Sequence, residues 1–128
     1  MLKAEIMTKL TNREEEILKI LWDLKEAFVK EIIERLPDEP KPHYNTISTM
    51  VRLMEEKGWV GHIAIGGSHK YYPILQKEEY KKSFIPKVIQ DYFDNSYKSM
   101  VTFFAKQDKL SADDLREILE MIEKEEEK

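Results

Sequence analysis

Residues 43–57 read His43-Tyr-Asn-Thr-Ile-Ser-Thr-Met-Val-Arg-Leu-Met-Glu-Glu-Lys57, and Gly58 follows them. The length of this segment predicts a helix, and Gly58 supplies the left-handed stop with which many helices end. Two short β-prone runs come next, Trp59 to Ile65 and His69 to Ile74, joined by Gly66-Gly67-Ser68. A polar-faced helix fits the major groove of DNA, and a hairpin directly behind it can lie along the adjacent backbone. The order of these elements therefore predicts a winged helix-turn-helix.

The predicted helix, which we expect to begin near Asn45 or Thr46, has two chemically different faces. Its apolar face carries Ile47, Met50, Val51 and Met54. Its opposite face carries Asn45, Ser48, Thr49 and Arg52. Asparagine can pair with adenine and arginine with guanine, and a threonine methyl can contact thymine. We also expect Thr46 to lie where the first backbone amides favour a phosphate. A solvated face without a partner is the alternative that the pattern leaves open.

The hairpin offers two more candidate DNA contacts, because His69 and Lys70 can reach a phosphate. Gly66-Gly67 gives the turn its freedom at positive φ. Tyr71 and Pro73 are expected to face the core.

Several kinds of chemistry are excluded. The chain has no cysteine, so disulfides, thiolate metal sites and cysteine nucleophiles are absent. The three histidines, His43, His62 and His69, match no zinc spacing, and no carboxylate completes a ligand set. No HExxH, phosphate-binding glycine loop, GxSxG or paired catalytic carboxylates occur. We expect neither a metal nor a cofactor, and the protein is not expected to be an enzyme.

The overall charge does not favour DNA binding. The 128 residues carry a net charge of −4, and 36% of them are charged. Residues 1–74 hold 11 basic against 12 acidic side chains, so most of the excess acidity lies in the C-terminal half. Nucleic-acid binders are often basic, but the local charge at the docking face matters more than the total. We expect modest, salt-sensitive affinity per monomer.

Two helices precede the segment 43–57. Thr11 to Glu14 has capping-box spacing, and the helix that follows repeats apolar residues at Ile17, Leu18, Leu21 and Trp22. Leu24 to Ala27 is a predicted turn. A second, shorter helix carries Val29, Ile32, Ile33 and Leu36, and it ends before Pro37.

The chain beyond Ile74 is predicted to be helical. Lys77 to Asn95 forms one helix, with a kink or break expected near Ile85 because Pro86 cannot donate its backbone hydrogen bond. Ser96 to Lys106 forms another, and Ser111 caps a third. The fold class is therefore mainly α with a small β-hairpin (α+β), divided into a winged helix-turn-helix domain at residues 1–75 and a helical dimerisation domain at 76–128.

These C-terminal helices have too little core of their own, and isolated helices of this length are marginal in water. They either pack back onto the same subunit or form a shared core with a second copy. We favour a homodimer, because a two-fold symmetric DNA-binding protein gains affinity and a defined half-site spacing. The candidate dimerisation residues are Tyr92, Phe93, Tyr97, Met100, Phe103, Phe104, Leu115, Ile118, Leu119 and Ile122.

The opening residues resemble neither a signal peptide nor a transit peptide, and no apolar run approaches the ~20 residues needed to span a bilayer. We expect a soluble, cytoplasmic protein without membrane insertion.

Several segments, in this order, resemble the BlaI/MecI family of penicillinase and methicillin-resistance repressors. They are Leu10–Ile17, Leu21-Trp22, Val29–Ile32, Thr46–Thr49, Arg52-Leu53, Glu56–Gly58, Tyr71–Pro73, Glu78–Tyr80 and Leu110-Ser111. The resemblance implies a winged helix-turn-helix, a helical dimerisation region and a dyad-symmetric operator. It implies base contacts for Asn45, Thr46 and Thr49. It also implies, as a partner, a membrane sensor-protease that detects β-lactam and cleaves an Asn-Phe bond.

Two departures from the family pattern concern function. Gly66-Gly67 stands where the wing often has Gly-Arg, and Phe103-Phe104 stands where the cleaved Asn-Phe bond would lie. The absence of cysteine excludes the copper-responsive branch. We predict a homodimeric transcriptional repressor that binds double-stranded operator DNA in the major groove. The competing prediction is a winged-helix protein-interaction module that does not bind DNA itself.

Overall fold

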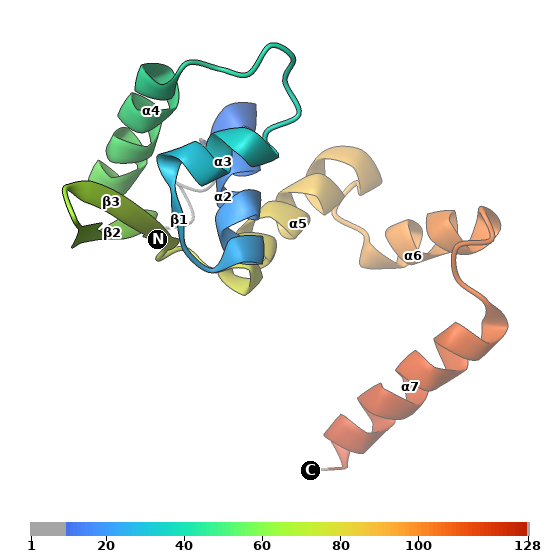
Figure 1. The fold of residues 1–128 in the computed structure, drawn as a ribbon. Coiled ribbons are helices and arrows are strands. Elements are labelled where there is room, and N and C mark those ends of the chain that lie inside the picture. The colour runs from blue at the N-terminus through green and yellow to red at the C-terminus, as the bar shows by residue number, and fades with distance from the viewer. Residues whose placement is uncertain (1–9, 128) are drawn as a thin grey trace. The chain divides into compact units, whose positions relative to one another are not determined.

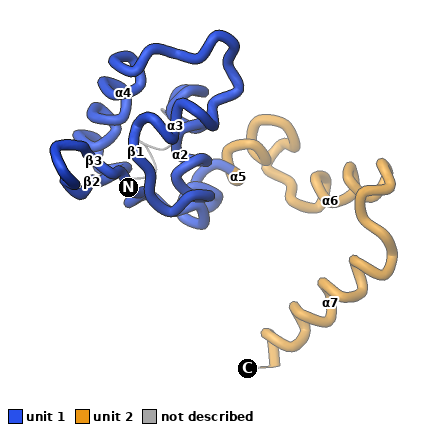
Figure 2. Tube along the Cα trace, in the orientation of Figure 1, with its two compact units in different colours: residues 1–84 blue, residues 85–128 orange. Residues whose placement is uncertain are grey.

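A computed structural model describes residues 10–127. Two compact units are found, and the boundary between them falls after Phe84 (Figure 2). The elements, drawn in Figure 1, are α2 (Asn12–Leu24), β1 (Ala27–Phe28), α3 (Val29–Arg35), α4 (Tyr44–Glu56), β2 (Val60–Ile65), β3 (Ser68–Pro73), α5 (Lys77–Phe93), α6 (Tyr97–Lys106) and α7 (Ala112–Glu126). The predicted class, mainly helical with a small antiparallel sheet, is confirmed.

Helix α2 begins with the predicted capping box. The amide of Glu14 donates to the Thr11 hydroxyl at 3.1 Å, and the amide of Thr11 donates to the Glu14 carboxylate at 2.9 Å. Glu14 is buried, and its second oxygen lies 3.2 Å from the ammonium of Lys57. This ion pair joins the start of α2 to the residue that ends α4.

The core of the first unit is one apolar cluster that receives side chains from every element of the winged domain. Its members include Ile17, Leu18, Leu21, Ala27, Ile32, Leu36, Ile47, Val51, Met54, Trp59, Val60, Tyr71, Leu75 and Tyr80. Tyr71 is buried as predicted, whereas Pro73 is only half-buried. Because burial of apolar surface is the main favourable term in folding, this cluster fixes how α4 lies against its neighbours.

The sheet has three strands, in the order β1-β3-β2, and all pairs are antiparallel. The turn predicted at Leu24 to Ala27 is shorter than expected. Helix α2 includes Leu24, and Ala27 already belongs to β1, where it pairs with Tyr71. Between them, Lys25 takes a positive φ of 76°. A two-residue strand shows no alternating pattern, so only its tertiary pairing with β3 defines it.

Of the kink or break predicted near Ile85, a break does not occur, because α5 continues through Pro86 to Phe93. Proline removes one hydrogen bond and crowds the carbonyl four residues earlier. The remaining bonds continue the helix beyond the proline, and it ends before Asp94 and Asn95, whose φ values are 50° and 61°. None of the helices in residues 10–127 is long and apolar enough to cross a bilayer.

Candidate nucleic-acid interface

Helix α4 presents a polar face because its apolar face is buried. Ile47, Val51 and Met54 are inaccessible to solvent. The candidate DNA-binding residues Asn45, Thr46, Thr49 and Arg52 are exposed, and Ser48 is half-buried. Four of the five DNA-binding residues predicted on this helix are therefore exposed to solvent. The helix that carries them is held in place by the core.

The start of α4 differs from the starts of most other helices. It begins at Tyr44, one or two residues earlier than predicted, and its N-cap residue is His43, which provides no side-chain hydrogen bond. The first turn has no acidic residue. By contrast, hydroxyl groups cap α2, α6 and α7, and they belong to Thr11, Ser96 and Ser111. The amide of Thr46 donates to the His43 carbonyl at 3.1 Å, but no side chain caps this turn. A helix start without a side-chain cap, together with the helix dipole, favours an anion such as a DNA phosphate.

The exposed face of α4 also carries two features that bear on base recognition. The guanidinium of Arg52 donates to the Thr49 hydroxyl at 3.3 Å, so these two side chains act together. Leu53 is 48% exposed beside them, although it belongs to neither of the two faces predicted from the sequence. The sequence could have indicated this position, because Leu53 follows Thr49 by four residues, and residues i and i+4 are neighbours on a helix. An exposed aliphatic group at this position can contact a thymine methyl.

The wing, defined as β2, β3 and their turn, holds its charged groups against the protein. The ammonium of Lys70 lies 3.5 Å from the Glu26 carboxylate and 5.2 Å from the centroid of the Phe28 ring. Lys70 is half-buried. The structure therefore places this predicted phosphate contact in an intramolecular ion pair.

Histidines of the wing connect it to α4. The His69 ring is stacked on the His62 ring, with centroids 4.0 Å apart and an interplanar angle of 13°. Nδ1 of His62 lies 2.8 Å from each carboxylate oxygen of Glu55, in the last turn of α4. Of the two predicted wing contacts, the exposed His69 is thus the more available to DNA.

A hollow of about 360 Å³ lies between the starts of α3 and α4 and the end of the wing. It is lined by Phe28, Val29, Lys30, Glu31, Tyr44, Ile65, Ser68 and His69. Tyr44 is 56% exposed, and Lys30 and Ser68 are also exposed. Apart from His69, these residues could not be predicted as neighbours, because only the fold brings α3 beside the wing. The hollow joins hydroxyl groups, an ammonium, an imidazole and the carboxylate of Glu31 next to the start of α4.

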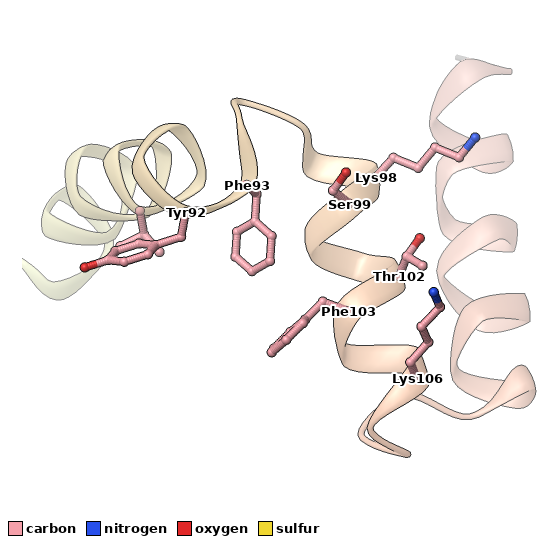
Figure 3. A pocket seen from close by; sticks show the side chains of 8 residues that line it. Tyr92, Phe93, Lys98, Ser99, Thr102, Phe103 and Lys106 are labelled. Atoms are coloured by element: carbon pink, nitrogen blue, oxygen red, sulfur yellow. The ribbon is translucent and has the colours of Figure 1, made fainter.

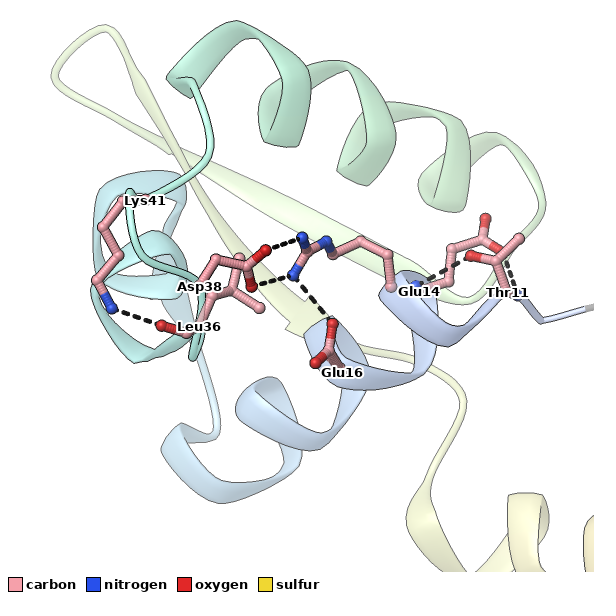
Figure 4. A network of polar contacts seen from close by, with 7 residues as sticks. Thr11, Glu14, Glu16, Leu36, Asp38 and Lys41 are labelled. Carbon is pink, nitrogen blue, oxygen red and sulfur yellow. Dashed lines mark hydrogen bonds and ion pairs between the residues drawn. The ribbon is translucent and has the colours of Figure 1, made fainter.

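The connection between α3 and α4 is fixed by a polar network (Figure 4). The guanidinium of Arg13 donates to both carboxylate oxygens of Asp38, at 2.8 and 2.6 Å, and to Glu16 at 3.0 Å. Hydrogen bonding from Arg13 lowers the pKa of the Asp38 carboxyl below its ordinary value. The ammonium of Lys41 donates to the carbonyl of Leu36. This network holds the segment that leads into α4.

The first turns of α5 are anchored to α2. The indole of Trp22 donates to the carbonyl of Leu75 at 2.8 Å, and the Tyr80 hydroxyl donates to the Glu15 carboxylate. Burial, reinforced by that carboxylate, raises the pKa of Tyr80. The same hydrogen bond lowers the pKa of Glu15. Both shifts favour the protonated hydroxyl beside the ionised carboxylate, which is the arrangement that this hydrogen bond needs.

The second unit leaves most of its apolar side chains exposed. Tyr92, Tyr97, Phe103, Phe104, Leu115, Ile118, Leu119 and Ile122 are exposed, and Phe93 and Met100 are half-buried. Helix α7 has no buried residue among those described. A groove of about 790 Å³, shown in Figure 3, is lined by Val88, Tyr92, Phe93, Lys98, Ser99, Thr102, Phe103 and Lys106. The rings of Phe93 and Phe103 lie edge to face, with their centroids 5.6 Å apart.

The order of helices and strands around an exposed polar helix defines a winged-helix protein with a helical C-terminal unit. The chain belongs to the penicillinase repressor family, which it matches over residues 10–124. It is 24% identical to the penicillinase repressor of Bacillus licheniformis over 115 residues, 90% of each chain. It is 25% identical to the methicillin resistance regulatory protein MecI of Staphylococcus aureus (strain N315) over 120 residues, 91% of this chain and 94% of MecI. The resemblance seen in the sequence is confirmed, and the family is one of transcriptional repressors, not of enzymes.

Proposed function

We propose that this chain represses transcription as a homodimer that binds a dyad-symmetric operator, with α4 in the major groove of each half-site. The observation that carries the proposal is the polar face of α4, on which Asn45, Thr49 and Arg52 are exposed. The opposite face is held in the core by the fully buried Ile47, Val51 and Met54. The half-sites would lie one or two DNA turns apart, at ~34 Å per turn. A repressor of this kind acts where the chromosome lies, in the cytoplasm.

Phosphate contacts would supply most of the affinity for DNA. The polar face of α4 would provide the sequence specificity. The start of α4 has no side-chain cap, which supports a phosphate there. Lys30, Tyr44 and His69 line the adjacent hollow and offer further donors. Few of these groups carry a full positive charge, so we expect a modest affinity for each subunit, which falls as salt is added.

The second unit supports dimerisation. A 15-residue helix without a buried side chain, α7, gains little stability by itself. Leu115, Ile118 and Ile122 form its exposed apolar stripe. A second copy would cover this stripe and the apolar groove between α5 and α6.

DNA binding is tested by selecting duplexes from a random pool and sequencing them, with an enriched inverted repeat as the expected result. Gel-shift titration of Arg52→Ala on that duplex should show a loss of about 1–3 kcal/mol if Arg52 reads a base, and a smaller salt dependence if it contacts phosphate. The matched control is Arg35→Ala, which should bind like wild type. Arg35 is an exposed arginine of α3, and its guanidinium pairs with the carboxylate of Asp23, in α2, at 2.9 Å. Unchanged affinity at both of two salt concentrations would remove Arg52 from the interface.

The oligomeric state is tested by light scattering. Ile118→Glu places a charge in the apolar stripe of α7 and should give a monomer that binds the operator weakly. Glu120→Ala, on another side of the same helix, should remain a dimer. The competing function, a protein-interaction module, predicts that the wild-type protein passes over nonspecific duplex at low salt without retention.

The membrane sensor-protease that the resemblance implies stays a prediction. Phe103-Phe104 lies inside α6, and the two rings meet edge to face at 5.5 Å. A protease needs an extended substrate, so α6 would have to unwind before cleavage there. Incubation with a sensor-protease of a relative, followed by mass spectrometry, tests whether this bond is cut.

A further inference from the structure

A second hollow of the first unit receives no lining residue from α4. It measures about 450 Å³, and we call it the α2–α5 pocket because it joins the end of α2, the end of β3 and the start of α5. Its lining includes Trp22, Lys25, Tyr72, Pro73, Gln76 and Lys77. Pockets of about 300–1,000 Å³ commonly hold small molecules. The α2–α5 pocket therefore has the size of a small-molecule site.

Two aromatic walls of the α2–α5 pocket are fixed by the fold. The indole of Trp22 donates to the carbonyl of Leu75 at 2.8 Å. The ring of Tyr72 lies over Gly61 of the neighbouring strand, since a Cβ on that glycine would come within 2.6 Å of the tyrosine oxygen. Aromatic walls pack well against a planar ring. Because both walls are already ordered, a ligand would lose little affinity in arranging them.

Two ammonium groups of the α2–α5 pocket are available to a negative charge. Lys25 and Lys77 are exposed, and neither forms an ion pair with a residue in 10–127. The carboxylates next to them in the sequence, Glu26 and Glu78, pair with other lysines at 3.5 and 2.9 Å. Opposite charges attract over several ångströms even near the surface. The pocket therefore favours an anion from solution.

The backbone of Lys25 is strained. Its φ of 76° and ψ of −43° lie outside the left-handed helical well and near the strained γ-turn. Glycine adopts such angles without a steric cost and is common just beyond a helix. Strained residues cluster where proteins hold ligands. A lysine at a position that suits glycine indicates that its side chain has a use.

We propose that the α2–α5 pocket binds a small planar organic anion. The negative group would pair with Lys25 and Lys77, and the ring would lie between Trp22 and Tyr72. Such a ligand would connect α2 to the first turn of α5, so it would also protect that turn from opening. The site shares no residue with the polar face of α4, and it does not depend on the proposed function.

The probe is benzoate, titrated into the full-length protein and followed by amide and indole NMR. The indole signal of Trp22 should shift and saturate, and that of the buried Trp59 should not. Benzamide has the same shape without the charge, and inorganic phosphate has the charge without the ring, so both should bind more weakly than benzoate. Amide exchange in residues 77–80 should slow when benzoate is bound.

Two substitutions test the charges. Lys25→Gln and Lys77→Gln should each weaken benzoate binding about fivefold, the effect of one exposed ion pair. The matched control is Lys87→Gln, which should bind like wild type. Lys87 is an exposed lysine of α5 outside the α2–α5 pocket, and its ammonium lies 3.6 Å from Asp91. The site would be overturned by the absence of a saturable shift at Trp22, by equal binding of benzamide, or by unchanged binding in both pocket variants.

Lys25→Gly separates binding from folding. Glycine relieves the strain, so this variant should unfold at the same or a higher urea concentration than wild type, yet bind benzoate about fivefold more weakly. A lysine at the end of a helix can also stabilise the helix dipole. Lower stability in Lys25→Gly with unchanged benzoate binding would assign Lys25 to that role alone and would overturn the site.

Discussion

Removal of one hydroxyl group, in Tyr80→Phe, should destabilise the winged unit. The Tyr80 hydroxyl donates to the carboxylate of Glu15 and thereby ties α5 to α2. A hydrogen bond to a charged group contributes about 1.5–3 kcal/mol to stability. Glu15 is partly exposed and also pairs with Lys19, so water and Lys19 would compensate part of the loss. We expect the free energy of unfolding to fall by about 1–2 kcal/mol at pH 7.

The pH dependence of this loss follows from the two pKa shifts. The pKa of Glu15 is lowered in the folded protein, so its contribution is present above the unfolded-state value of about 4.3 and disappears as the pH falls through the folded-state value. The pKa of Tyr80 is raised, so its contribution is complete below the unfolded-state value of about 10 and diminishes above it. The difference between wild type and Tyr80→Phe should therefore be constant from about pH 5 to 9 and smaller on both sides.

Urea unfolding monitored by tryptophan fluorescence measures this difference. Both tryptophans, Trp22 and Trp59, belong to the core of the first unit, so the signal reports on that unit. Tyr44→Phe is the control, since Tyr44 is exposed in the same unit, and its loss of stability should be near zero. A loss in Tyr80→Phe that is as large at pH 3 as at pH 7 would refute the coupling to Glu15.

Three other substitutions test the site and its support. Arg13→Ala removes both bonds to Asp38, so amide hydrogen exchange in residues 37–43 should accelerate while circular dichroism stays unchanged; equal exchange rates would contradict a role in fixing this connection. Leu53→Ala should weaken operator binding by about 1 kcal/mol, and uracil in place of the contacted thymine should weaken wild type but not this variant. Gly61→Ala places a Cβ 2.6 Å from the Tyr72 hydroxyl oxygen. It should cost about 1–3 kcal/mol in urea unfolding, and less when Tyr72 is also alanine.

The reading helix and the hairpin could be predicted because their signals are local. Ile47, Val51 and Met54 share one side of a helical period, and all three are fully buried. Gly58 ends the segment with a φ of 85°, the left-handed conformation expected of such a stop. The helical spacing of apolar residues and the glycine at the helix end, both within 16 residues, were sufficient to predict this part of the fold.

The environment of the wing could not be predicted, because it depends on residues distant in the sequence. Nothing near Lys70 indicates that Glu26 and Phe28 will occupy it, and these residues reach it only through the short pairing of β1 with β3. At Pro86 the sequence predicted a kink or a break. The break does not occur, because one missing hydrogen bond is a small loss within the 17 residues of α5.

The bare start of α4 implies that the unbound protein is less stable than its own fold allows. Serine or aspartate at position 43 would give the first turn a side-chain cap and stabilise the helix by about 1 kcal/mol. The same oxygen would occupy the position at which we propose a DNA phosphate, and an aspartate would also repel that phosphate. If the proposal is correct, heat tolerance and operator affinity favour different residues at position 43, and His43 leaves the helix start without a side-chain cap.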